Sequence, residues 1–173
     1  MKYYAVIDTN VLVSSMLTSD PASTIARIVD AVRQGVITPM YNETIMEEYR
    51  SVLLRDRFHF SVDRINELIS LIKNKGINCE RCLVNEVFPD PDDIVFYEVA
   101  MSREDSYLVT GNLKHFPKNG RVVSPADMLY IIEYGDKNPG LLSEPEESYY
   151  LPISLAEINA IIREARMALQ AGV

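Results

Sequence analysis

The chain has 173 residues, 47% of them hydrophobic, and a formal net charge of −8. This length suffices for one well-formed core and is short for two complete domains, so we expect one main domain. The negative charge argues against a protein that coats nucleic acid non-specifically, because neutralising phosphates requires clustered Lys and Arg side chains. It does not exclude an enzyme that acts on nucleic acid.

No apolar stretch approaches the roughly 20 residues that a membrane-spanning helix needs. The N-terminus enters a predicted strand directly, without a basic region and a cleavage site. We therefore expect a cytoplasmic protein with no membrane partner. Cys79 and Cys82 form a C-x-x-C pattern, but the two histidines, His59 and His115, are single and distant in sequence, so four zinc ligands are not indicated.

The first ten residues, Met1 to Asn10, form an apolar, β-favouring run that stops at Asp8. This pattern predicts a buried strand with Asp8 at its C-terminal end. In parallel α/β sheets, ligands bind beyond the carboxyl ends of the strands, so Asp8 would lie where chemistry is usually done. The alternative is that Asp8 only caps the turn that follows.

Helical and strand patterns then alternate, which predicts right-handed βαβ units and a parallel sheet. The expected elements are a helix from Asp20-Pro21 to Gly35, a strand at 36–38 ended by Pro39, a helix capped by Asn42, a helix from Ser61 to Gly76, a strand around 82–84, a helix starting at Asp90-Pro91, strands at 107–111 and 122–123, and a helix from Ser124 to Glu133.

Two further acids fall on apolar helix faces. Glu48 lies three residues after Ile45 and four before Val52, on the buried stripe, whereas Glu47 is rotated toward solvent. Burying an unpaired carboxylate costs several kcal/mol, so such an acid is normally paired, hydrogen-bonded or bound to a metal. The alternative for Glu48 is a structural pair with an arginine at the helix edge.

The second acid is Asp93, which shares a stripe with Phe96 and Ala100 at i+3 and i+7. Asp90 and Asp92 are better candidates for capping this helix, because acids in a first turn interact favourably with the helix dipole. Asp8, Glu48 and Asp93 would converge at one edge of the sheet. Like charges at such a place favour a cation, and an all-oxygen site suits Mg²⁺ or Mn²⁺.

These motifs resemble the PIN-domain family, particularly bacterial toxin–antitoxin ribonucleases, over residues 3–133. The resemblance rests on the apolar run into Asp8-Thr9-Asn10-Val11-Leu12-Val13, on Glu48-Tyr49 leading to Val52-Leu53, on Asp90-Pro91-Asp92-Asp93 leading to Ala100, and on Val109-Thr110-Gly111-Asn112. It implies a three-layer α/β/α sandwich with four or five parallel strands in residues 1–134. The implied activity is a Mg²⁺- or Mn²⁺-dependent endoribonuclease that cleaves single-stranded RNA, with a small antitoxin protein as partner.

Carried over to this chain, Asp8, Glu48 and Asp93 resemble the catalytic metal-binding acids, and Asn10 and Thr110 resemble polar supports. The family often places a fourth acid after the Thr-Gly pair, where this chain has Asn112. Asparagine supplies no negative charge, so a second metal ion would be held less tightly. Weaker candidates for contacts with the RNA backbone are Lys114 and His115; the alternative places both in an ordinary surface loop.

Residues 135–173 lie outside the resemblance, and we expect a linker followed by an amphipathic helix. Ser154 to Glu157 form a capping box, and the apolar stripe that follows contains Ile158, Ile161, Ile162, Ala165 and Leu169. This helix must bury its apolar face on the body, on a second copy or on a partner. We expect a homodimer whose interface the helix enlarges.

Two other functions remain open at this stage. A phosphatase of the haloacid-dehalogenase kind also uses a strand-terminal Asp, but it resembles D-x-D, and here the second acid is replaced by Asn10. A non-catalytic or weakly active PIN-like module that binds RNA or protein is favoured by Asn112 and by the acidic composition. Metal-dependent cleavage by the purified protein separates this alternative from the nuclease.

Overall fold

Five parallel strands form the centre of the molecule in a computed structural model that describes residues 1–135 and 151–172. The strands lie in the order β3-β2-β1-β4-β5, so that β1, the apolar N-terminal run, is the middle strand. The expected parallel α/β sheet is confirmed. The strands are β1 (Tyr3–Ile7), β2 (Ile37–Tyr41), β3 (Ile77–Asn78), β4 (Ser106–Val109) and β5 (Val122–Val123).

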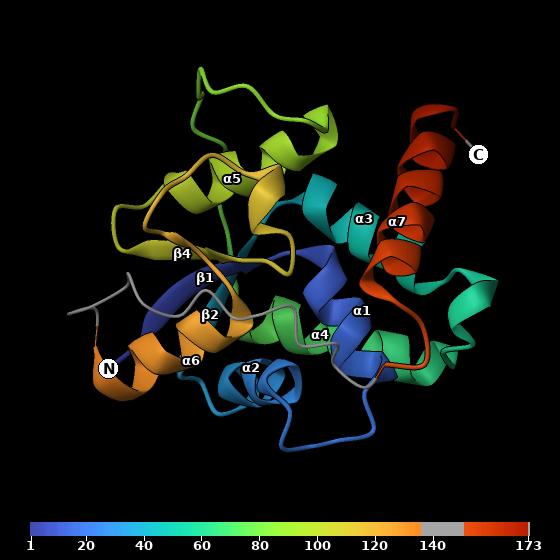
Figure 1. The fold of residues 1–173 in the computed structure, drawn as a ribbon, viewed down its shortest axis with the longest axis horizontal. Helices are drawn as coiled ribbons and strands as arrows, with labels where there is room; N and C mark the ends of the chain where they lie inside the picture. Colours follow the sequence, from blue (N-terminus) through green and yellow to red (C-terminus); the bar gives the residue numbers. More distant parts are fainter. Residues whose placement is uncertain (136–150, 173) are drawn as a thin grey trace.

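Helices cover both faces of the sheet, as Figure 1 shows, with α5 on one side and α2, α4 and α6 on the other. Helices α1 and α3 extend beyond the C-terminal ends of β1 and β2. The helices are α1 (Thr9–Leu17), α2 (Thr24–Arg33), α3 (Glu43–Leu53), α4 (Val62–Lys75), α5 (Ile94–Met101), α6 (Pro125–Tyr134) and α7 (Leu155–Gln170). Short 3₁₀ helices lie at Asp56–Phe58, Pro91–Asp93 and Leu113–His115.

Capping residues define most helix ends as expected. The side chains of Asn42 and Ser61 accept hydrogen bonds from backbone N–H groups of α3 and α4, and Ser124 forms a capping box on α6. Helix α2 is different. It begins after Ser23, whose side chain accepts from the Ala26 N–H, and not at Asp20-Pro21 as the sequence suggests.

Helix α1 is not predicted by the sequence pattern, because nearly all its side chains are buried and no polar face marks the helical period. Pro39 also differs from expectation, since it lies inside β2, opposite Ala5 of β1. Strand β3 pairs with Met40 and Tyr41, beyond Pro39, so the proline lies on a part of β2 where a missing N–H is tolerated.

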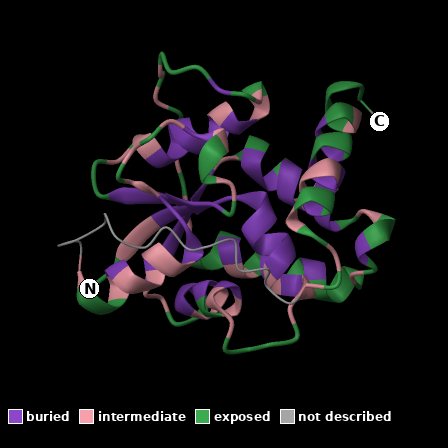
Figure 2. Ribbon diagram, viewed as in Figure 1, coloured by how far each residue is buried: buried purple, intermediate pink, exposed green. Residues whose placement is uncertain are grey.

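The prediction of a strand around residues 82–84 is wrong. The third strand of the sheet is Ile77–Asn78, and residues 79–88 form an irregular connection in which Leu83 and Val87 are exposed. Apolar residues there favour a strand locally, but Figure 2 shows that this connection lies on the outside of the molecule, away from the buried interior.

Helix α7 packs on the body of its own chain, against α1 and α3. Its capping box is present, and Ile158, Ile161, Ile162 and Ala165 are buried. The same chain covers these four residues, so they are not available to a dimer interface, whereas Leu169, the fifth residue of the predicted stripe, is 40% exposed. Most of the expected linker, residues 136–150, lies outside the described residues. Within the described part of the chain, no helix is long and apolar enough to cross a membrane.

Candidate active site

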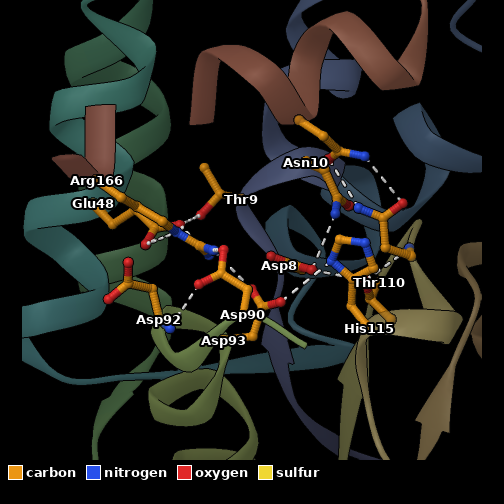
Figure 3. A network of polar contacts seen from close by, with 12 residues as sticks. Asp8, Thr9, Asn10, Glu48, Asp90, Asp92, Asp93, Thr110, His115 and Arg166 are labelled. Atoms are coloured by element: carbon orange, nitrogen blue, oxygen red, sulfur yellow. Dashed lines mark hydrogen bonds and ion pairs between the residues drawn. The ribbon is translucent and has the colours of Figure 1, made fainter. Parts of the chain in front are cut away.

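Asp8 lies at the junction between β1 and α1, and its side chain points into the polar network of Figure 3. It is 3% exposed and makes no side-chain capping bond to α1, in contrast to the capping alternative. Instead Asp8 Oδ2 accepts hydrogen bonds from Asn10 Nδ2 at 3.0 Å and from Thr110 Oγ1 at 2.7 Å. Two neutral donors thus orient the carboxylate at the centre of the strand ends.

Asn10 and Thr110 connect the ends of β1 and β4. Asn10 Oδ1 accepts from the Gly111 N–H at 3.0 Å, and Thr110 Oγ1 accepts from the Asn112 N–H at 2.9 Å. A Cβ at Gly111 would lie 3.1 Å from Asn10 Oδ1, so glycine permits this close approach. The structure therefore places both expected supporting residues directly on Asp8.

Asp93 ends the 3₁₀ turn that precedes α5 and is 3% exposed. Its Oδ1 lies 2.9 Å from Arg166 Nη1. Its Oδ2 is buried without a hydrogen-bond partner among the described residues, and His115 Nδ1 lies 3.3 Å from it, close enough for an ion pair when the imidazole is protonated. A buried carboxylate oxygen without a hydrogen bond is costly unless a cation or a water molecule satisfies it.

Glu48 is buried on α3 while Glu47 is exposed, as helical phase predicts. Glu48 Oε1 accepts from Thr9 Oγ1 at 2.6 Å. Both carboxylate oxygens also accept from a single arginine, Arg166, through Nε at 2.9 Å and Nη2 at 3.1 Å. This two-point contact is the strong geometry for a carboxylate–guanidinium pair.

Arg166 is a site residue that the sequence motifs do not single out. It comes from α7, is 7% exposed, and also donates from Nη1 to Asp90 Oδ2 at 2.9 Å. Figure 3 shows its guanidinium between Glu48 and the turn that carries Asp90 and Asp93. The signal was present, because Arg166 follows Ile162 by four residues and so lies on the apolar stripe of α7.

A second polar contact holds α7 at the other side of the site. Asn112 Nδ2 donates to Asn159 Oδ1 at 2.8 Å, and Asn159 Nδ2 donates to Asn112 Oδ1 at 3.2 Å. Asn112, which follows the Thr-Gly pair, thus binds α7 through a reciprocal amide pair. Asn112 is close to Asp8 in the network, but its side chain is directed at the helix.

A pocket of about 400 Å³ opens beside Asp8 and Asp93. Helix α7 contributes residues to its lining that include Arg163 and Arg166, and His115 also lines it. His115 is half-buried, whereas Lys114 is exposed next to it. The two expected RNA-contacting residues therefore differ, since His115 faces the site and Lys114 lies on the adjacent surface.

Burial dominates the electrostatics of these acids. Burial, and after it the nearby charge of Asp93, raise the pKa of Asp8 from 3.8 to about 6, while the Thr110 hydrogen bond opposes the change. Burial also raises the pKa of Glu48 and of Asp93, with Arg166 opposing it in both cases. The site carries excess negative charge that Arg166 only partly compensates.

These residues fit a hard divalent cation held by few protein ligands. Asp8 and Asp93 are close enough for each to affect the other's ionisation, and Asp93 Oδ2 is a buried acceptor without a hydrogen bond. Mg²⁺ commonly binds through one or two carboxylates and keeps several waters. Within residues 1–135 and 151–172, no three His, Cys, Asp or Glu side chains are arranged to hold one ion together. Glu48 is bound by Arg166 instead.

Buried carboxylates at the strand ends of a parallel α/β sheet are the kind of site at which divalent ions act on phosphate esters. A family model of the PIN domain matches residues 4–114, more than half of the 173 residues. The chain belongs to the PIN-domain family, whose members are generally nucleases that use divalent metals. No curated protein and no solved structure matches the chain. The family match ends before α7, so Arg166 lies outside it.

Proposed function

We propose that this protein is a metal-dependent endoribonuclease that cleaves single-stranded RNA in the cytoplasm. The observation that carries the proposal is the pair of buried carboxylates, Asp8 and Asp93, at the pocket beyond the strand ends, with Asp93 Oδ2 free of hydrogen bonds among the described residues. Asp8 and Asp93 would hold Mg²⁺ or Mn²⁺. Such an ion, when bound, activates water and neutralises charge on a phosphodiester.

The remaining residues of the site have supporting roles in this proposal. Asn10 and Thr110 hold Asp8 in one orientation and favour its ionised form, because both donate to the same oxygen. Glu48 contributes by anchoring Arg166. His115 and Arg163 line the pocket, where their side chains provide donors for phosphate oxygens, and Lys114 extends this surface.

The biological role that we propose is that of a toxin, controlled by a small antitoxin protein and acting as a homodimer. Support for this role comes from the family resemblance of the Asp8, Glu48 and Asp93 motifs. The dimer interface would lie outside the apolar face of α7, which its own chain covers. Growth arrest on induced expression, relieved by Asp8→Asn, is the expected cellular result.

The direct test is cleavage of labelled single-stranded RNA by the purified full-length protein with Mn²⁺. We expect fragments that disappear on chelation and a loss of more than about 10²-fold in rate for Asp8→Asn, because this change keeps the shape and removes a ligand charge. The matched control is Asp63→Asn, which alters an exposed aspartate in the first turn of α4. Equal Mn²⁺-dependent cleavage by Asp8→Asn would contradict the proposal.

A non-catalytic PIN-like module remains the second candidate. It is favoured by Arg166, which holds both oxygens of Glu48, and by the absence of an acid at Asn112. The same assay separates the two candidates. A module that only binds RNA would retain the RNA on a gel without fragments, with Mn²⁺ or without it.

A further inference from the structure

We propose that Arg166 is a built-in cation of this site, which remains on Glu48 and Asp93 while a single divalent ion binds beside it. The inference rests on the proposed metal-dependent function and specifies how the chain balances charge there. It assigns a positioning role to Arg166 and makes α7 a structural part of the active site, although α7 lies outside the family match.

The first step is the net formal charge of the buried acids together with Arg166. Asp8, Glu48, Asp90 and Asp93 bring four negative charges, and Arg166 brings one positive charge through its contacts with the last three. With His115 neutral, a net charge of −3 remains (four minus one). One divalent ion reduces this charge without reversing it, whereas Asn112 adds no further acid for a second ion.

The second step is to separate the carboxylate oxygens that contact Arg166 from the one that remains for a metal ion. Arg166 takes both oxygens of Glu48 and Oδ1 of Asp93. Asp93 Oδ2 is left without a hydrogen bond among the described residues and belongs to a side chain that lines the pocket with Asp8. The arginine and a metal ion would therefore use different atoms of Asp93, so neither needs to displace the other.

The third step is the attachment of α7, which decides between a fixed cation and a displaceable one. Four apolar side chains of α7 are buried against the body, and Asn159 forms the reciprocal amide pair with Asn112 two turns before Arg166. Withdrawing Arg166 from the site by moving the helix would break all of these contacts. The geometry favours an arginine that stays in place.

The first experiment measures Mn²⁺ binding to the full-length protein by calorimetry. Removing the charge in Arg166→Met leaves a net charge of −4 and should tighten Mn²⁺ binding at least about tenfold. The double variant Glu48→Gln/Arg166→Met restores the wild-type charge and should bind Mn²⁺ within about threefold of wild type. Arg57→Met is the control for a charge lost from an exposed position outside the pocket, with a smaller expected effect.

The second experiment uses the unaltered protein, so it does not depend on how the variants fold. Hydrogen exchange of residues 155–170 is compared with and without saturating Mn²⁺. A fixed arginine predicts equal or greater protection of α7 with the ion bound. Loss of protection on Mn²⁺ binding would show that the ion expels Arg166 and would overturn the inference, while the proposed metal site stayed intact.

The two proposals fail in different ways. Mn²⁺ binding by Arg166→Met but not by the wild type would make the arginine a block and would overturn both the inference and the metal-dependent function of the unaltered protein, whereas loss of α7 protection on Mn²⁺ binding overturns the inference alone. Absence of Mn²⁺ binding in the wild type and in every variant would overturn the proposed function and the inference together. Equal affinity in Arg166→Met and wild type would show that the arginine does not set the charge at the metal.

Discussion

The two halves of the site hold a buried carboxylate with different kinds of hydrogen-bond donor, neutral in one half and charged in the other. Asp8 is held by the neutral donors Asn10 and Thr110, whereas Glu48 is held by the guanidinium of Arg166. Both acids are nearly inaccessible to solvent, and burial raises the pKa of each. Neutral donors orient Asp8 and leave its charge available to a cation, while Arg166 already compensates Glu48. Equal burial of the same chemical group therefore does not imply the same role.

The Glu48 half should be the more sensitive to loss of one partner. A buried ion pair adds little stability compared with a well-packed apolar pair, but removing one member leaves an uncompensated charge and costs about 3–5 kcal/mol. The Asp8 half already contains an uncompensated charge in the absence of metal. Changes that neutralise Asp8 should therefore stabilise the metal-free protein, which is the reverse of the effect expected at Glu48 and Arg166.

The largest expected effect comes from Arg166→Met without metal. Loss of the guanidinium leaves Glu48 buried without a cation and should lower the free energy of unfolding by about 3–5 kcal/mol. Urea denaturation in the presence of a chelator measures this change. In the double variant Glu48→Gln/Arg166→Met, at least half of the loss should be recovered. Equal stability of the single variant and the wild type would show that the pair does not hold α7 to the body.

The second-largest change in stability is expected at Glu48, in comparison with its neighbour Glu47 on α3. Glu48→Gln keeps the hydrogen bond from Thr9 but weakens the contact with Arg166, so we expect a loss of about 1–3 kcal/mol and a clear decrease in RNA cleavage. Glu47→Gln changes an exposed side chain and should alter stability by less than about 0.5 kcal/mol. The reverse order would mean that the register of α3 is displaced by one residue.

Helical phase is sufficient to predict which acids face inward, but it predicts nothing where the sequence lacks a polar face. Glu48 and Asp93 share faces with apolar residues, and both are buried. Helix α1 has no polar face, so its sequence carries no helical period. The segment at 82–84 is apolar enough for a strand, but strand pairing depends on neighbours that local sequence does not reveal.

Arg166 shows a different limit. Its position on the stripe of α7 indicates that it is buried, by the same reasoning that applies to Glu48. The stripe does not indicate which acid it meets, because Glu48 lies 118 residues earlier in the chain. Only the docking of α7 on α1 and α3 brings the two together. The sequence thus predicts the buried acids of the candidate site, and the fold supplies their partner.

The last expected effect is a pH dependence of stability that distinguishes the Asp8 half. The pKa of Asp8 is raised to about 6 by burial first and by Asp93 second, from the ordinary value of 3.8. The folded protein therefore keeps a proton on Asp8 at pH values at which the unfolded chain has lost it. Ionised Asp8 lowers folding stability by about 1–3 kcal/mol above about pH 6, and this penalty vanishes below about pH 4.

Asp8→Asn removes that penalty, so the metal-free variant should be more stable than wild type at pH 7, with a gain that shrinks to nothing as the pH falls from about 6 to about 4. Chemical denaturation in a chelator at a series of pH values measures the difference. Asp63→Asn, at an exposed position, should show no such slope. A gain that is constant with pH would mean that the pKa of Asp8 is the same in the folded and unfolded chains, so that burial does not perturb its ionisation. Because saturating Mn²⁺ binds the ionised carboxylate, it should reverse the order of the two stabilities at pH 7.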